Sequence, residues 1–327
     1  MTRTEKSIVS TLQEAEWIWM DGELIPWHEA KIHVLSLAVQ FGSSVFEGVR
    51  CYKTSDGPAI FRLKDHLERL FDSARVFHMD HAFTIEQLTQ ACAMTVERNA
   101  LEECYIRPMV LRGYGAAGMS PAGSPVQVVI PAWPWGTYLG PDALEQGVDV
   151  CVSSWQRAEP NTFPIAAKAA GNYNNAQLIK HEATTNGFAE AIALGTGGLV
   201  SEGSGQNVFL VRKGTLITPT VDGTLLSGIT RDTVITLATE LGIPVREQPI
   251  PRETLYMADE IFLTGTASEV VPVRSVDRTP VGSGKAGPIT RQLQRRYMEV
   301  VRGETLDKWD WLSHTRAGAR HGMAIHR

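Results

Sequence analysis

One lysine of this sequence stands in surroundings that suit covalent chemistry. Lys168 lies in the run PIAAKAAG at residues 164–171, where the side chains around it are small and uncharged. Small neighbours let another molecule come close and leave little water around the amine, which favours the neutral form that attacks an aldehyde. The segment therefore predicts a Schiff-base lysine. The ordinary alternative is a lysine that reaches into solvent from a loop.

A glycine-rich segment, GGLVSEGSGQNVF at residues 197–209, surrounds a single carboxylate, Glu202. Glycines let the backbone approach a ligand closely, so Glu202 can face that ligand. A carboxylate that faces a pyridine nitrogen keeps it protonated, and this makes a pyridoxal ring an electron sink. The alternative is a glycine-rich turn with a solvated glutamate.

Three further features predict contacts to an anion. Residues 227–232, SGITRD, open a predicted helix, and free N–H groups at a helix start point toward any phosphate placed there. Residues 264–269, TGTASE, follow a predicted strand and form a turn of small residues with exposed amides. Arg69 adds a cation on the polar side of another predicted helix. Taken singly, these features could equally be helix capping, turn chemistry and a surface ion pair.

The elements that must position these residues follow from the hydrophobic pattern. Strands are expected at residues 17–20, 24–27, 44–52, 59–63, 105–111, 126–132, 148–155, 189–194, 207–212, 215–218 and 260–264. Helices are expected at residues 66–77, 84–99, 173–185, 230–241 and 288–302. Strands and helices mix without a regular alternation, and no glycine motif of a dinucleotide-binding or P-loop fold opens a helix. The pattern predicts a mixed α/β protein with an α+β first half.

A domain boundary is expected near residues 131–141. The sequence there, PAWPWGTYLGP, is rich in proline, glycine and aromatic residues, which is typical of an ordered connection. We predict an N-terminal domain over residues 1–132, a connection over 133–141 and a C-terminal domain over 142–327, because a chain of 327 residues exceeds the usual size of one core.

Composition excludes several classes of partner. With 31 Lys and Arg against 36 Asp and Glu there is no basic surface for nucleic acid, and no metal-binding motif is present. The four cysteines are widely spaced, so we expect reduced thiols. We find no signal peptide and no apolar run that would span a membrane, and therefore expect a cytoplasmic protein.

Taken together, the segments resemble a known family. EGSGQNVF at 202–209 and LSGITR at 226–231 resemble the signature of class IV pyridoxal-phosphate aminotransferases. The segments AAKAAGNY at 166–173, FGSSVFEGVR at 41–50, YIRP at 105–108 and PWGTYLG at 134–140 resemble the bacterial branched-chain amino acid aminotransferases. The likeness covers about residues 15–312.

The resemblance implies a two-domain, fold-type IV enzyme that forms a homodimer or higher homo-oligomer, with pyridoxal 5′-phosphate between the domains. By motif match, Lys168 would carry the cofactor as a Schiff base and shuttle the proton. Glu202 would face the ring nitrogen, and Tyr173 would donate to the 3′ oxygen. The phosphate would be held by Arg69, Ile229, Thr230 and Thr266.

The resemblance also implies a substrate pocket. Phe46, Trp135 and Tyr138 would form an apolar wall, with Tyr105 and the Thr266-Ala267 turn at the α-carboxylate. Arg107 would bind the distal carboxylate of glutamate or 2-oxoglutarate. The implied reaction is a ping-pong exchange of the amino group between L-leucine, L-isoleucine or L-valine and 2-oxoglutarate.

Two departures and two alternatives accompany the resemblance. Phe41 stands where many of these enzymes have a tyrosine, and the loop GYGAAGM at residues 113–119 differs from the commonest bacterial version. The basic tail after Leu312 lies outside the likeness, so we expect it to be flexible. A related enzyme acting on D-amino acids, (R)-amines or aminodeoxychorismate would share the cofactor residues, but the VFEG and YIRP segments argue against it. A non-catalytic relative would lack Lys168 or Glu202, and both are present.

Overall fold

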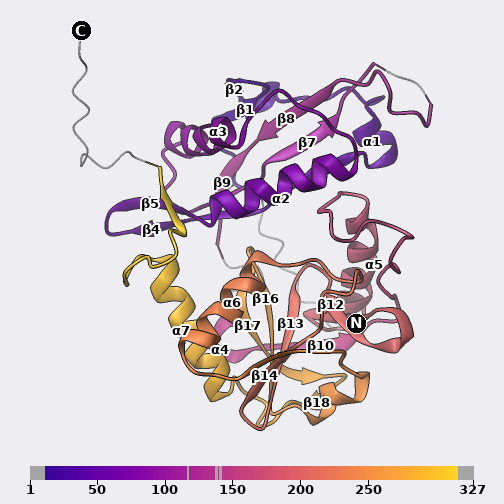
Figure 1. Ribbon diagram of the computed structural model, residues 1–327, viewed down its shortest axis with the longest axis vertical. Coiled ribbons are helices and arrows are strands. Elements are labelled where there is room, and N and C mark those ends of the chain that lie inside the picture. The colour runs from indigo at the N-terminus through magenta and orange to yellow at the C-terminus, as the bar shows by residue number, and fades with distance from the viewer. Residues whose placement is uncertain (1–11, 116–117, 137–138, 140–141, 316–327) are drawn as a thin grey trace, which may run out of the picture.

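The computed structural model describes residues 12–115, 118–136, 139 and 142–315. The chain folds into two halves, one above the other in Figure 1, and the last strand returns from the second half to the first. No helix in the part of the chain that the structure describes is long and apolar enough to cross a bilayer.

The first half contains two antiparallel five-stranded sheets, with the orders β2-β1-β8-β7-β3 and β19-β5-β4-β6-β9. Their strands are β1 (Trp17–Met20), β2 (Glu23–Pro26), β3 (Ser44–Phe46), β4 (Val49–Thr54), β5 (Gly57–Phe61), β6 (Cys104–Ile106), β7 (Met109–Arg112), β8 (Val126–Ile130), β9 (Ala132–Pro134) and β19 (Leu312–His314). The helices of this half are η1 (Trp27–Glu29), α1 (Leu37–Phe41), α2 (Leu63–Val76) and α3 (Ile85–Arg98).

Helices α2 and α3 pack on the sheets through apolar stripes. In α2 the buried side chains include Leu63, Leu67 and Leu70, which recur at the spacing of one helix face. Helix α3 starts with a capping box, in which the Thr84 side chain accepts from Gln87 N–H and the Gln87 side chain accepts from Thr84 N–H. Both helices match the predicted ones within three residues.

The second half is built on a nine-stranded mixed sheet. The pairings β12–β11–β10–β17–β16–β13–β12 close six of its strands into a ring. The strands are β10 (Val148–Val152), β11 (Glu190–Leu194), β12 (Val200–Gly203), β13 (Asn207–Arg212), β14 (Thr215–Thr218), β15 (Val245–Glu247), β16 (Glu260–Gly265), β17 (Glu269–Val276) and β18 (Thr279–Pro280). The helices are α4 (Ala143–Gln146), α5 (Asn172–Thr185), η2 (Thr196–Gly198), α6 (Ile229–Glu240), η3 (Arg252–Met257) and α7 (Pro288–Val301).

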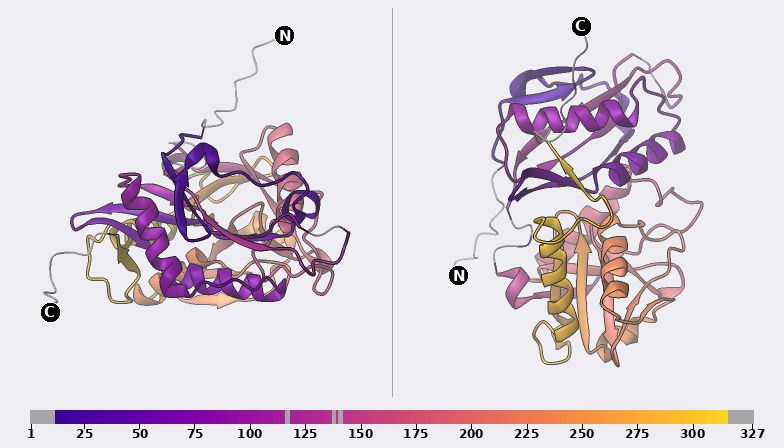
Figure 2. Two further views of the ribbon diagram at one scale, coloured as in Figure 1. Left: turned by 90° about the horizontal axis from the view of Figure 1, so that it is seen from above. Right: turned by 60° about the vertical axis from the view of Figure 1, so that its left-hand side comes forward.

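The two halves share part of one core. One buried cluster joins Tyr52 and Phe61 of the first half to Phe209, Leu293 and Tyr297 of the second. Strand β19 pairs with β5, so that Leu312 lies opposite Phe61, and Figure 2 shows this strand reaching into the first half. The division at residues 133–141 stays a prediction.

Three predicted strands are wrong in the same way. Residues 44–52, 105–111 and 126–132 were each expected to form one strand, but each is split into two that belong to different sheets. The splits fall at Glu47-Gly48, at Arg107-Pro108 and at Pro131. Proline has no N–H to donate to a ladder, and Glu47 N–H and Arg107 N–H instead donate to Pro108 and Pro131 carbonyls.

Other predicted elements are confirmed with small changes at their ends, including α5, α6, α7, β11, β13 and β16. Strand β17 and the strand β12 that carries Glu202 were not predicted. The expectation of a flexible tail after Leu312 is wrong for Ser313 and His314, which pair with Ile60 and Ala59. The four cysteines are free and buried, as expected.

Candidate active site

A cleft between the two halves collects most of the predicted site residues. Its lining from the first half includes Phe46, Arg69, Tyr105, Arg107 and Trp135. Its lining from the second half includes Lys168, Tyr173, Glu202, Ile229, Thr230, Thr266 and Ala267. Tyr138 lies outside the described residues.

The backbone of Lys168, which lines this cleft, is held by elements of the first half. Its N–H donates to Ser73 Oγ on α2 at 2.9 Å, and its carbonyl accepts from Phe46 N–H at 3.0 Å. The neighbouring Ala169 forms a β-bridge with Val45, next to Phe46. The backbone of the lysine is therefore fixed between α2 and β3, and only its side chain is free to move.

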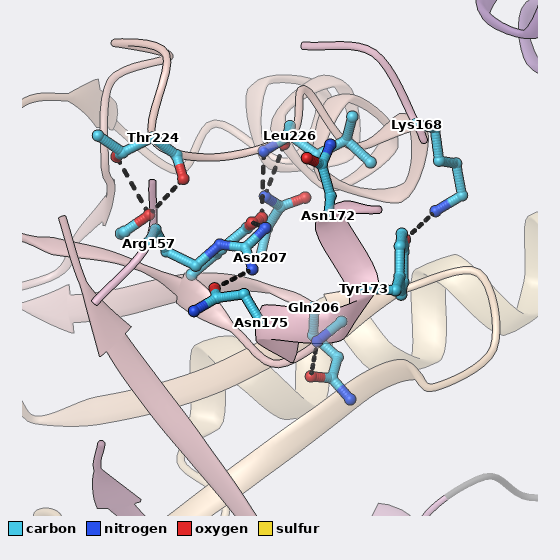
Figure 3. A network of polar contacts seen from close by, with 12 residues as sticks. Arg157, Lys168, Asn172, Tyr173, Asn175, Gln206, Asn207, Thr224 and Leu226 are labelled. Carbon is cyan, nitrogen blue, oxygen red and sulfur yellow. Dashed lines mark hydrogen bonds and ion pairs between the residues drawn. The ribbon is translucent and has the colours of Figure 1, made fainter. Parts of the chain in front are cut away.

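The amine of Lys168 points at a tyrosine. Lys168 Nζ lies 2.5 Å from Tyr173 Oη, and Tyr173 stands in the first turn of α5 (Figure 3). Both groups pack against the ring of Phe46, whose centroid is 5.1 Å from Lys168 Nζ and 4.7 Å from the Tyr173 ring. A phenol this close to an amine can exchange a proton with it.

Glu202 lies on β12 and is 5% exposed. One carboxylate oxygen accepts from Leu226 N–H at 3.1 Å, and the other is 2.8 Å from an Arg157 nitrogen. Burial raises the pKa of Glu202, while the positive charges of Arg157 and Lys168 act in the opposite direction.

The start of α6 presents backbone amides to the cleft. Gly228 precedes the helix, and no side chain in the described part of the chain caps it, so Ile229 and Thr230 N–H groups have no partner within the helix. A Cβ at Gly228 would lie 2.0 Å from Asn207 Oδ1, so only glycine allows this close packing. Together with the Thr266 turn after β16, these amides form an anion-binding wall.

Arg69 completes the anion-binding wall and is not a surface residue. Its Nε and one terminal nitrogen donate to the two carboxylate oxygens of Glu47 at 2.6 and 2.9 Å, and another donates to the Ser227 carbonyl at 2.8 Å. Glu47 is fully buried and also bonds to His66 Nδ1 at 2.7 Å. The alternative of an exposed ion pair for Arg69 is therefore excluded.

A second cation, Arg107, faces the cleft among aromatic rings. Its guanidinium lies 4.9 Å from the Phe46 ring centroid and 5.2 Å from that of Tyr105. Its Nε is buried, and among the described residues no hydrogen-bond partner meets that atom. The Tyr105 ring in turn stacks near Trp135, with centroids 4.8 Å apart. This part of the cleft combines an apolar wall with a cation that has no carboxylate partner among the described residues.

Three residues of the site were missed by the sequence analysis. Glu47 anchors Arg69, and Gly48 makes room for Tyr105, because a Cβ there would lie 1.7 Å from the Tyr105 hydroxyl. Their position inside the FEG segment was the available signal. Arg157 lies in SSWQRAEP at residues 153–160, and nothing in that segment distinguishes it from a solvated arginine.

The comparisons with known proteins agree with this geometry. The model of the family described as amino-transferase class IV matches residues 44–276, which is most of the chain. The chain belongs to the class IV aminotransferases. This class IV aminotransferase is 49% identical to the branched-chain-amino-acid aminotransferase of Escherichia coli (strain K12) over 303 residues, which cover 92% of the chain and 98% of that relative.

Solved structures of the same kind superpose on this aminotransferase. The crystal structure of the Escherichia coli branched-chain amino acid aminotransferase matches with a TM-score of 0.91, covering 93% of this chain and 100% of that one at 49% identity. The branched-chain amino acid aminotransferase from Thermobaculum terrenum, in its pyridoxal-phosphate-bound form, matches with a TM-score of 0.86 and 37% identity, covering 93% of this chain and 99% of that one. Both matches confirm the expected mixed α/β fold of this family.

Among the described residues of this aminotransferase, no three His, Cys, Asp or Glu side chains gather as metal ligands would. The charged groups that line the cleft are instead three arginines, one lysine and one glutamate. Such a set suits an organic anion with a basic ring nitrogen.

Proposed function

We propose that this protein is a branched-chain-amino-acid aminotransferase that uses pyridoxal 5′-phosphate. It exchanges the amino group between L-leucine, L-isoleucine or L-valine and 2-oxoglutarate. The observation that carries the proposal is the contact of Lys168 Nζ with Tyr173 Oη at 2.5 Å, in a cleft that places Glu202 and an anion-binding wall around it. The 49% identity to the Escherichia coli enzyme over nearly the whole chain supports the substrate class.

The residues present fit this cofactor. The uncapped start of α6, the guanidinium of Arg69 and the Thr266 turn offer donors for a phosphate, and Gly228 keeps that wall open. Glu202 offers a carboxylate oxygen to the ring nitrogen of the cofactor, and Tyr173 offers a hydroxyl to its 3′ oxygen. When bound, the cofactor supplies an aldehyde for amines and a ring that accepts electrons from the substrate Cα.

The chain's own groups do the remaining work. Lys168 Nζ would anchor the aldehyde and then move the proton at the substrate Cα, and the Tyr173 hydroxyl would hold that amine in place between turnovers. Because Lys168 is fixed by Ser73 and Phe46 through its backbone, its flexible side chain can reach both positions without any movement of the loop.

Two substrate shapes fit one pocket. The rings of Phe46 and Trp135 suit an aliphatic side chain, while Arg107 suits the distal carboxylate of 2-oxoglutarate. The Tyr105 hydroxyl and the amides of Thr266 and Ala267 would bind the α-carboxylate of either substrate. Phe41 is 49% exposed and is not among the residues that line this cleft, so Arg107 is the residue proposed to discriminate for 2-oxoglutarate.

The assembly is a homodimer or higher homo-oligomer in this proposal. Four large apolar side chains between residues 34 and 41 are exposed, namely Val34 (71%), Leu35 (51%), Val39 (55%) and Phe41 (49%). A cluster of this kind marks a protein interface, and the adjoining Gly42 packs on Gly171 at the start of α5, close to the cleft. Light scattering on the purified protein checks this. V39E should yield a smaller particle, whereas L306E, at an exposed leucine outside this cluster, should not.

A spectrum of the purified protein tests the function. With cofactor added, we expect an absorbance band between 300 and 500 nm that L-leucine shifts and 2-oxoglutarate restores. Lys168→Ala should lose this conversion, whereas Lys64→Ala, at an exposed lysine on α2, should keep it. A band that no branched-chain amino acid shifts would overturn the substrate assignment, and the absence of any band would overturn the cofactor assignment.

A further inference from the structure

Arg157 is a buried arginine that pairs with Glu202. It follows β10 in the chain, is 8% exposed and lines the cleft. Its N–H donates to the Leu194 carbonyl at 2.9 Å, which fixes the backbone against β11. Its guanidinium reaches one Glu202 oxygen at 2.8 Å.

A second contact sets the direction of this side chain. Arg157 donates to Asn175 Oδ1 at 2.8 Å (Figure 3), and Asn175 donates through Nδ2 to the Gln156 carbonyl at 3.0 Å. Asn175 lies on α5 two residues after Tyr173, so the helix that carries the Lys168 contact also orients Arg157.

The charge of Glu202 depends on this neighbour. A glutamate that is 5% exposed and lacks a cation takes up a proton much more readily than a solvated one. A protonated carboxyl group is a poor acceptor for the N–H of a pyridinium ring. The charged groups that act on Glu202 are Arg157 and Lys168. In the proposed function the Lys168 amine bonds to the cofactor and then moves a proton, so its charge changes during the reaction. Arg157 is thus the permanent counter-charge.

We propose that Arg157 is a positioning residue that keeps Glu202 ionised and aimed at the ring nitrogen of the cofactor, with Asn175 holding Arg157 in place. The inference rests on the proposed function. It differs from an ordinary structural ion pair in one respect: removal of Arg157 changes the pH range over which the protein binds its cofactor, because Glu202 then protonates at higher pH.

Cofactor affinity across pH tests this. The full-length protein is freed of cofactor and titrated with pyridoxal phosphate from pH 5.5 to 9, following absorbance and tryptophan fluorescence. For Arg157→Met we expect the affinity for pyridoxal phosphate near neutral pH to fall by about tenfold to a hundredfold. A loss of this size is typical when a residue that hydrogen-bonds a metal ligand is removed, and Arg157 supports Glu202 in the same way. The acidic fall in affinity should move to higher pH than in the wild type. Arg157→Lys should restore part of both.

The double variant separates a role through Glu202 from a general loss of stability. In a Glu202→Gln background, the side chain at position 202 cannot ionise, so adding Arg157→Met should change cofactor affinity by no more than about twofold. Arg296→Met is the matched control, because Arg296 pairs with Glu240 away from the cleft. It should lower stability without moving the pH profile.

Outcomes that overturn the inference are distinct from those that overturn the function. Parallel pH profiles for wild type and Arg157→Met, or independent losses in the double variant, would exclude the positioning role while leaving the aminotransferase intact. If Arg157→Met does not fold, Asn175→Ala carries the test, and an acidic limb that lies where it does in the wild type excludes the role. A wild-type protein that binds no cofactor refutes the proposed function itself.

Discussion

At the residue scale, the cleft depends on buried groups that touch no substrate. Glu47 is fully buried and bonds to both Arg69 and His66. Burial by itself would raise the pKa of Glu47, but the charges and hydrogen bonds of Arg69 and His66 outweigh it and hold that pKa well below its usual range. The carboxylate therefore stays ionised and fixes the guanidinium that would meet the phosphate.

Removal of the Glu47 carboxylate should weaken both folding and cofactor binding. Glu47→Ala leaves Arg69 buried without its partner, which costs about 3–5 kcal/mol of unfolding free energy. Because the folded pKa is lowered, the stability from Glu47 is present above the ordinary glutamate pKa and is lost as pH falls toward the folded value. Urea denaturation at several pH values checks this. Glu47→Gln should depend less on acid pH than the wild type, and an equal dependence would contradict the assignment.

Gly48 should affect substrate binding more than folding. A Cβ at this position would overlap the Tyr105 hydroxyl, so Gly48→Ala displaces the ring that is proposed to meet the α-carboxylate. We expect KM for both L-leucine and 2-oxoglutarate to rise by about tenfold or more, the equivalent of one lost hydrogen bond of about 1.4 kcal/mol. Gly136→Ala, where a Cβ meets no described residue within 4 Å, is the control. Unchanged KM values in Gly48→Ala would place Tyr105 outside the site.

At the element scale, the sequence predicted helices and catalytic segments better than strand breaks. Helical spacing placed α2 and α3 closely, because that signal is local. The splits at Glu47-Gly48 and Pro131 depend on which sheet each half-strand joins, a choice made by distant partners. Arg157 was missed for the same reason: its partners Glu202 and Asn175 lie 45 and 18 residues along the chain.

The break between β6 and β7 at Arg107-Pro108 should affect the binding of 2-oxoglutarate more than that of L-leucine. Arg107 and Pro108 connect β6, which ends at Ile106, to β7, which begins at Met109, and Arg107 lines the cleft. Pro108→Ala restores backbone freedom, which costs about 0.4–1 kcal/mol of stability through the unfolded chain and loosens this connection. We expect KM for 2-oxoglutarate to rise more than KM for L-leucine, because the proposed partner of Arg107 is the distal carboxylate, which only 2-oxoglutarate carries. Steady-state kinetics with each substrate decides this, and equal changes in the two KM values would argue against the role of Arg107. Pro280→Ala, on the exposed strand β18, is the control.

At the scale of the whole molecule, the cleft lies between halves that are tied together around it. Arg62 of the first half binds Asp232, the Thr233 hydroxyl and the Ile229 carbonyl in the first turn of α6. On the other side, Arg50 of β4 pairs with Glu269 of β17 at 3.0 Å. These ties reach the anion-binding wall and the Thr266-Ala267 turn, so motion between the halves would disturb every proposed contact at once.

The Arg50–Glu269 pair should therefore stabilise the contact between the two halves, which the shared core makes unfold together. Both side chains are 8% exposed, and Glu269 also accepts from the Tyr52 hydroxyl at 3.1 Å. Glu269→Gln keeps the shape but leaves the Arg50 charge buried without its counter-charge, which costs about 3–5 kcal/mol. Adding Arg50→Met removes that unpaired charge and should recover part of the loss, because a buried ion pair is replaceable by apolar packing at little cost. Urea unfolding followed by far-UV circular dichroism and by tryptophan fluorescence should give one coincident transition in each variant, since Tyr52 and Phe61 share a core with Phe209 and Tyr297. Two separated transitions would show that the halves unfold independently. A double variant with a lower free energy of unfolding than Glu269→Gln would contradict the role given to the ion pair.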